Sequence, residues 1–203
     1  MSNLEKALGR LLKNDELAAF LAAVLAYASK TGRISYSEVT EIVGENPEEV
    51  LLLGNRWRLL LPVKVEKSSA WEDRLLLCKL GESYVLPNIV QNLVQNASKT
   101  GCWAPMKAIA EVFKEIGEPA WQQMPELAAE LGKRARDGQV SAVQIKEIFI
   151  RAGLGDKIDV IIAELKGTGV MSPKLSSLAE VSRATSPMYE LNPSLFLKKG
   201  DTE

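Results

Sequence analysis

Apolar residues recur at helical spacing along much of the chain, and glycine marks where most of these runs end. The first strong run, 15–30, predicts a helix that Asp15 caps and that stops before Gly32, because glycine tolerates the left-handed backbone of a helix end. A short extended piece at 33–35 and a second helix near 37–43 follow. The pattern therefore begins as helix, short strand, helix.

Cap residues indicate where the later helices start. Ser35 or Ser37 can cap the second helix, and an Asn-Pro pair opens a third helix over 46–57, since asparagine is a favoured cap and proline suits a first turn. Two β-rich runs, 59–65 and 74–80, enclose a short polar turn. We expect these two runs to form a hairpin.

The same pattern occurs again further along the chain. LAAVLAYASKTGRIS at 21–35 matches LAAELGKRARDGQVS at 127–141 with an offset of 106 (127 − 21), and the match continues without a gap to Ile42 and Ile148. The second copy predicts helices over 125–136, 141–152 and 156–166, and a hairpin from 170–175 and 188–193. The sequence thus predicts two copies of one unit.

This repeat sets the expected fold class and domain organisation. We expect a mainly α fold with small β-hairpins (α+β), in two domains, 1–82 and 119–203, joined by a helical connector at 83–118. The connector carries apolar stripes in 83–98 and 104–116. These stripes either bury against the domains or each other, or form the seam of a homodimer.

The element order resembles the winged helix-turn-helix family over about 17–80 and 124–197. The phrase MYELNPSLFLKKG at 188–200 is similar to the last wing strand of winged-helix plasmid replication initiators, in which an aromatic residue precedes an Asn-Pro turn. Tandem winged helices also occur in segregation-and-condensation B-type proteins and in endosomal-sorting subunits, which use the fold to bind proteins. The resemblance implies two winged-helix domains and leaves the ligand open.

The first expectation for the ligand is double-stranded DNA, as in a transcriptional regulator, because winged helices so often bind DNA, and a partner protein is the alternative. In such proteins the third helix of each unit enters the major groove, and the wing lies on the phosphate backbone. Residues 51–100 hold seven basic and four acidic residues, 7 − 4 = +3, although the whole chain has a net charge of −1. The residues expected on DNA are Asn55, Arg56, Arg58, Lys64, Lys67, Lys133, Arg134, Arg136 and Lys157. For the basic residues of 133–136, a favourable interaction with the helix dipole is the alternative explanation.

The other implied ligand is a partner protein, which makes the chain an adaptor. Glu48 and Glu49 lie at the start of the third helix, where they would repel phosphates. A helix cannot hide three consecutive leucines, Leu51 to Leu53, on one narrow stripe. We therefore expect Leu51 and Leu52 to contribute to a protein interface, unless the connector covers them.

Composition argues against several other classes. The chain has no histidine, and its two cysteines form no CxxC pair, so the sequence predicts no metal site and no disulfide framework. It has no glycine-rich phosphate loop and no activated nucleophile, so we expect neither an enzyme nor a cofactor. No apolar run approaches the roughly 20 residues that span a bilayer, and the amphipathic N-terminus is not a signal peptide. We expect a cytoplasmic protein without a membrane partner.

Overall fold

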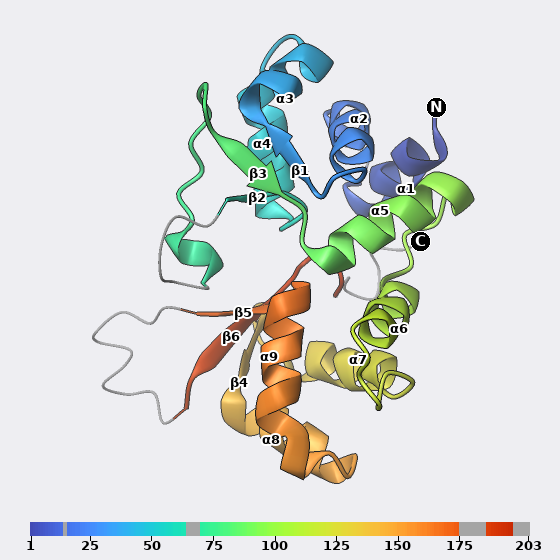
Figure 1. The fold of residues 1–203 in the computed structure, drawn as a ribbon, viewed down its shortest axis with the longest axis vertical. Helices are drawn as coiled ribbons and strands as arrows, with labels where there is room; N and C mark the ends of the chain where they lie inside the picture. The colour runs from blue at the N-terminus through green and yellow to red at the C-terminus, as the bar shows by residue number, and fades with distance from the viewer. Residues whose placement is uncertain (14–15, 64–69, 175–185, 197–203) are drawn as a thin grey trace.

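The computed structural model describes residues 1–13, 16–63, 70–174 and 186–196 (Figure 1). In these ranges the chain is mainly helical and carries two antiparallel sheets of three strands each, as expected for an α+β fold. Figure 1 shows the N-terminal half as an upper lobe and the C-terminal half as a lower lobe, with one sheet in each.

The upper lobe follows the predicted order closely. Its elements are α1 (Asn3–Leu11), α2 (Ala18–Ala28), β1 (Arg33–Ser35), α3 (Tyr36–Val43), α4 (Pro47–Arg56), β2 (Leu61–Pro62), the 3-10 turn η1 (Trp71–Asp73) and β3 (Ser83–Val85). Ser35 caps α3 in a capping box with Glu38, and Gly44 ends that helix. Asn46 precedes Pro47 as predicted, but its side chain makes no cap hydrogen bond because its backbone is left-handed.

The lower lobe repeats these elements. They are α7 (Met124–Arg134), β4 (Gln139–Ser141), α8 (Ala142–Arg151), η2 (Gly155–Lys157), α9 (Ile158–Thr168), β5 (Met171–Pro173) and β6 (Met188–Leu191). Ser141 caps α8 in a capping box with Gln144, which matches the cap of α3 at an offset of 106 (141 − 35). The predicted helices and the 188–193 strand of this half are confirmed within a few residues.

The two sheets have the same topology, and equivalent residues pair in the same register. The strand orders are β1-β3-β2 and β4-β6-β5, so the last strand lies in the middle each time. In the upper sheet Tyr84 pairs with Ile34 and Pro62. In the lower sheet Tyr189 occupies the same place between Val140 and Pro173. The repeat seen in the sequence is therefore a repeat of structure.

The strand expected at 74–80 is wrong. The third strand is Ser83–Val85, which the sequence had assigned to the connector. The apolar run at 74–80 does not pair, and its Leu75 and Leu80 are exposed. The short strand forms because Tyr84 is buried between both neighbouring strands and donates its hydroxyl hydrogen to Leu77 O at 2.5 Å.

The helices between the lobes are α5 (Asn88–Thr100) and α6 (Pro105–Glu115). Their apolar stripes are buried: α5 contacts α1 and α2, α6 contacts α7, and the two helices contact each other. This confirms burial against the domains as the role of the stripes. A homodimer seam would need another surface of these helices.

Equivalent residues of the two lobes meet at the junction. Arg58 and Gly169 each follow the third helix of their lobe and have positive φ angles of 53° and 86°. Asn192 Nδ2 donates to both of their carbonyl oxygens, at 3.3 Å and 3.1 Å. A Cβ atom on Gly169 would lie 2.3 Å from Pro87 Cβ, so the two backbones approach each other closely there.

Candidate binding surfaces

The outer face of α4 is acidic and apolar. Leu52 is 62% exposed, and Glu48 and Glu49 are exposed at the start of the helix. Leu51 is fully buried in the core, so the expectation that it belongs to an exposed interface is wrong. Its position in the helix turns it inward, and only Leu52 of this pair is left for a surface role.

The segment that follows η1 passes close to this face. Tyr36 donates its hydroxyl hydrogen to Glu48, and this hydrogen bond lowers the pKa of the carboxyl group. Burial raises the pKa of the Cys78 thiol, and the negative charge of Glu48 adds to that effect. Leu75 and Leu80, on the same segment as Cys78, are exposed.

Arg58 is occupied by the junction between the lobes. Its Nε and Nη2 donate to the two carboxylate oxygens of Glu190 at 3.0 Å and 3.2 Å, and its Nη1 donates to Asn55 Oδ1 at 2.9 Å. The guanidinium also lies 5.7 Å from the ring centre of Trp71. Arg58 and Asn55 were expected on DNA, but these contacts engage both side chains within the protein.

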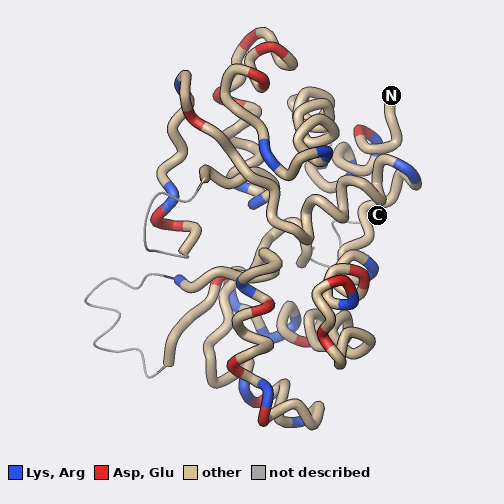
Figure 2. Tube along the Cα trace, in the orientation of Figure 1, with Lys and Arg blue, Asp and Glu red and all other residues tan. Residues whose placement is uncertain are grey.

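The remaining residues expected on DNA are scattered. Arg56 is exposed at the end of α4, and Lys157 is exposed just before α9. Lys64 and Lys67 lie outside the described residues. Figure 2 shows basic and acidic residues interspersed along the described chain of both lobes.

The basic residues at the end of α7 are mostly paired. Lys133 lies 3.7 Å from Glu130, and Arg134 contacts both Glu130 and Glu147 at 3.1 Å. Arg136 is exposed, and its backbone pairs with that of Gln139. These intramolecular pairs and the helix dipole account for the 133–136 cluster.

The outer face of α9 resembles that of α4 in chemistry. Val160 is 56% exposed, and Asp156, Asp159 and Ala163 are exposed beside it. Both third helices therefore present carboxylates next to an apolar side chain. A base-reading face would instead need arginine, lysine, asparagine or glutamine.

Two acidic side chains, Glu164 of α9 and Glu118, interact with each other. Glu118, in the loop after α6, is 3% exposed, and its Oε1 accepts from Ala120 N at 2.7 Å. Burial raises the pKa of Glu164, and the Glu118 carboxylate raises it further. One oxygen of Glu164 is buried without a hydrogen-bond partner. Among the described residues no group of three or more His, Cys, Asp or Glu could hold a metal ion.

Comparison with known proteins places the chain in a family. One family model matches residues 2–199, almost the whole chain. The chain belongs to this family, whose function is unknown. No curated protein matches the chain, and no solved structure does. None of the described helices is long and apolar enough to cross a membrane.

Proposed function

We propose that the chain is a non-catalytic adaptor built from two winged-helix units. The support is the order helix, strand, helix, helix, strand, strand, which occurs twice with the last strand central in each sheet. This is the order of the winged helix-turn-helix resemblance in the sequence. The fold alone does not choose a ligand, so the chemistry of the outer faces decides.

The outer face of α4 carries the proposal. Its Leu52 is 62% exposed beside the carboxylates of Glu48 and Glu49. Leu75 and Leu80, on the segment that follows η1, are 74% and 77% exposed. The ligand that complements this face is an amphipathic segment of a partner protein with basic and large apolar side chains. Burial of one leucine side chain stabilises such a complex by about 1.5–3 kcal/mol, and the carboxylates favour basic partners.

A displayed peptide library tests this assignment. We expect selection on the wild-type protein to enrich peptides that combine lysine or arginine with large apolar residues. Leu52→Glu should weaken their binding about tenfold or more, whereas Val143→Glu, a control at a 52% exposed position of α8, should not. Peptides that bind both variants equally, or a selection without enrichment, would refute the adaptor.

Double-stranded DNA is the second candidate ligand. It is favoured by exposed Arg56 and Lys157, which lie on or beside the third helices of the two units. Together with Lys64 and Lys67, which the sequence offers outside the described residues, they would contact phosphates instead of bases. Such binding would be weak, insensitive to sequence and strongly dependent on salt.

Fluorescence anisotropy with a random-sequence duplex separates the two candidates. The adaptor predicts no binding, even at low salt. Micromolar binding that weakens with salt would replace the adaptor by the DNA-binding function. In that case Arg56→Gln and Lys157→Gln should each make the slope of log affinity against log salt less steep by about one. Lys99→Gln, at an exposed position of α5, serves as the control.

A further inference from the structure

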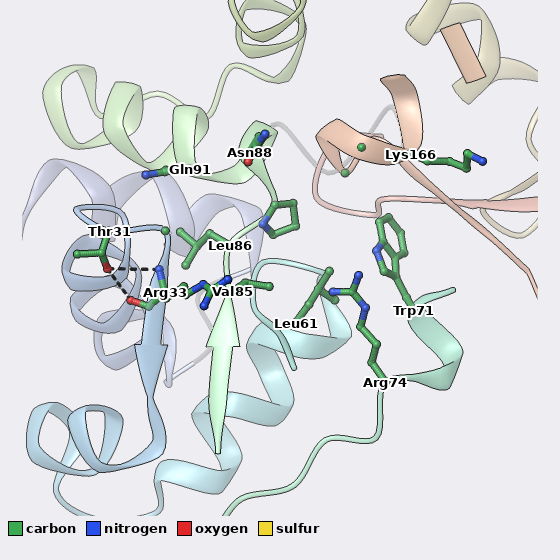
Figure 3. Close-up of a pocket in the computed structure, with 14 residues that line it drawn as sticks. Thr31, Arg33, Leu61, Trp71, Arg74, Val85, Leu86, Asn88, Gln91 and Lys166 are labelled. Atoms are coloured by element: carbon green, nitrogen blue, oxygen red, sulfur yellow. Dashed lines mark hydrogen bonds between the residues drawn. The ribbon is translucent and has the colours of Figure 1, made fainter. Parts of the chain in front are cut away.

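A pocket of about 370 Å³ lies where the two lobes meet (Figure 3). Residues of β1, β2, η1 and the start of α5 line it from the upper lobe, and the end of α9 lines it from the lower lobe. Three of the lining residues are cationic, Arg33, Arg74 and Lys166, and none of the described lining residues is acidic. The charges of these described lining residues therefore favour an anionic ligand.

The guanidinium of Arg74 is incompletely hydrogen-bonded in this pocket. Its Nε atom is buried without a hydrogen-bond acceptor, and its Nη1 donates only a long bond of 3.4 Å to Pro62 O. No ion pair joins it to the described residues, and burial lowers the pKa of its guanidinium. A partly buried guanidinium with an unsatisfied N–H group is destabilising, so an anion in the pocket would complete its contacts.

The first turn of α5 supplies a second feature that favours an anion. Its N-cap is Pro87, and no side chain makes a cap hydrogen bond to the turn. The free N–H groups of a first turn, with the positive end of the helix dipole, attract negative groups. Pro87 and Asn88 both line the pocket, so this turn borders the same space as Arg74.

Figure 3 shows how the cationic side chains lie. The guanidinium groups of Arg33 and Arg74 extend toward each other from opposite sides of the pocket. Lys166 lies at the rim, and its side chain extends away from them. Both arginines line the same pocket, and each carries the planar donor fork that suits an oxyanion.

We propose that this pocket binds a small molecule through an oxyanion group, phosphate or carboxylate, held by Arg33, Arg74 and the first turn of α5. A pocket of this volume suits a small ligand and not a polymer. Because both lobes line the pocket, the bound ligand bridges them and stabilises their junction. The site is independent of the α4 face and of any DNA contact.

The test uses the full chain with two probes, pyrophosphate and citrate, at constant ionic strength. Titration calorimetry measures binding, and thermal unfolding measures stability. We expect at least one probe to bind and to raise the unfolding midpoint by about 4 °C or more at saturation. The probe with the higher affinity identifies the group as phosphate or carboxylate.

Variants separate the pocket from general anion effects. Arg33→Gln and Arg74→Met should each weaken binding about tenfold or more, since a hydrogen bond to a charged group is lost. Arg74→Met should also raise the midpoint of the unliganded protein, because it removes a partly buried cation with an unsatisfied N–H group. Arg151→Gln, at an exposed position of α8, makes the same charge change elsewhere and should bind like wild type. Equal binding by all variants, or no binding by wild type, would overturn the proposal.

Discussion

The ion pair between Arg58 and Glu190 should couple the stability of the two lobes. The contact joins the end of the upper lobe's third helix to the central strand of the lower sheet. Its side chains are 19% and 22% exposed, so solvent screens the pair only in part. Replacing both residues singly and together, as Arg58→Met and Glu190→Gln, measures the coupling in a double-mutant cycle.

The expected magnitude follows from the geometry. At the 3.0 Å separation of Nη2 and Oε1, two unit charges attract by about 5.5 kcal/mol at an effective dielectric constant of about 20. Desolvation of two partly buried groups and residual screening remove most of this energy. The two-pronged geometry retains a net coupling of about 1–2 kcal/mol. Arg58→Met alone should cost about 2–3 kcal/mol, because it also removes the bond to Asn55 and leaves Glu190 unpaired.

Urea unfolding, followed by circular dichroism and by tryptophan fluorescence, provides the free energies. A coupling below about 0.3 kcal/mol, which is the usual additivity of independent sites, would refute the argument. The single variant also bears on the DNA expectation. A surface contact for phosphate would leave stability unchanged when Arg58 is replaced, whereas a junction residue would not.

Three further predictions concern a glycine at the junction, a carboxyl group with a raised pKa and two neighbouring leucines. Gly169→Ala should lower the free energy of unfolding by at least about 2 kcal/mol in urea, because the φ of 86° strains alanine and the new Cβ would lie 2.3 Å from Pro87 Cβ. Glu164→Gln should raise the thermal midpoint at pH 7 and not at pH 4. The raised pKa of Glu164 means that the folded protein favours the neutral carboxylic acid. The stability that the neutral acid contributes is therefore present at low pH and is lost as pH rises through the folded-state pKa. A midpoint that falls at pH 7 would contradict it. Leu51→Ala, at a fully buried position, should cost about 2–5 kcal/mol, and Leu52→Ala, at a 62% exposed one, under about 0.5 kcal/mol. Equal losses in urea would contradict the assigned burial.

Cap residues and short sequence patterns predicted the helix starts and the first strand of each unit well. Ser35, one of the two candidate caps, caps its helix, and Ser141 caps the equivalent helix of the second copy. In both, a serine followed three residues later by glutamate or glutamine satisfies free N–H groups of the first turn. The extended piece at 33–35 is a strand with the predicted bounds, and its counterpart at 139–141 in the second copy is a strand as well. These features depend on neighbours within a few residues, which the sequence displays directly.

Features that depend on distant partners could not be predicted. Strand Ser83–Val85 is only three residues long and follows a more apolar run, so hydrophobicity favoured 74–80. The leucine run required an exposed member, but the packing of the core determined that Leu52 and not Leu51 is exposed. Arg58 finds its partner 132 positions away in sequence. Its positive charge alone suggested a ligand outside the protein.

The duplication has a physical consequence that neither copy has alone. Arg58 and Gly169 hold equivalent places after the third helices, yet one carries a long cation and the other has no side chain. That difference lets Pro87 approach Gly169 while Arg58 reaches Glu190, so the two lobes pack asymmetrically. The oxyanion pocket opens at this asymmetric contact and takes its lining from both copies. A single unit would therefore lack part of the pocket wall, so the proposed anion site requires both copies of the repeat.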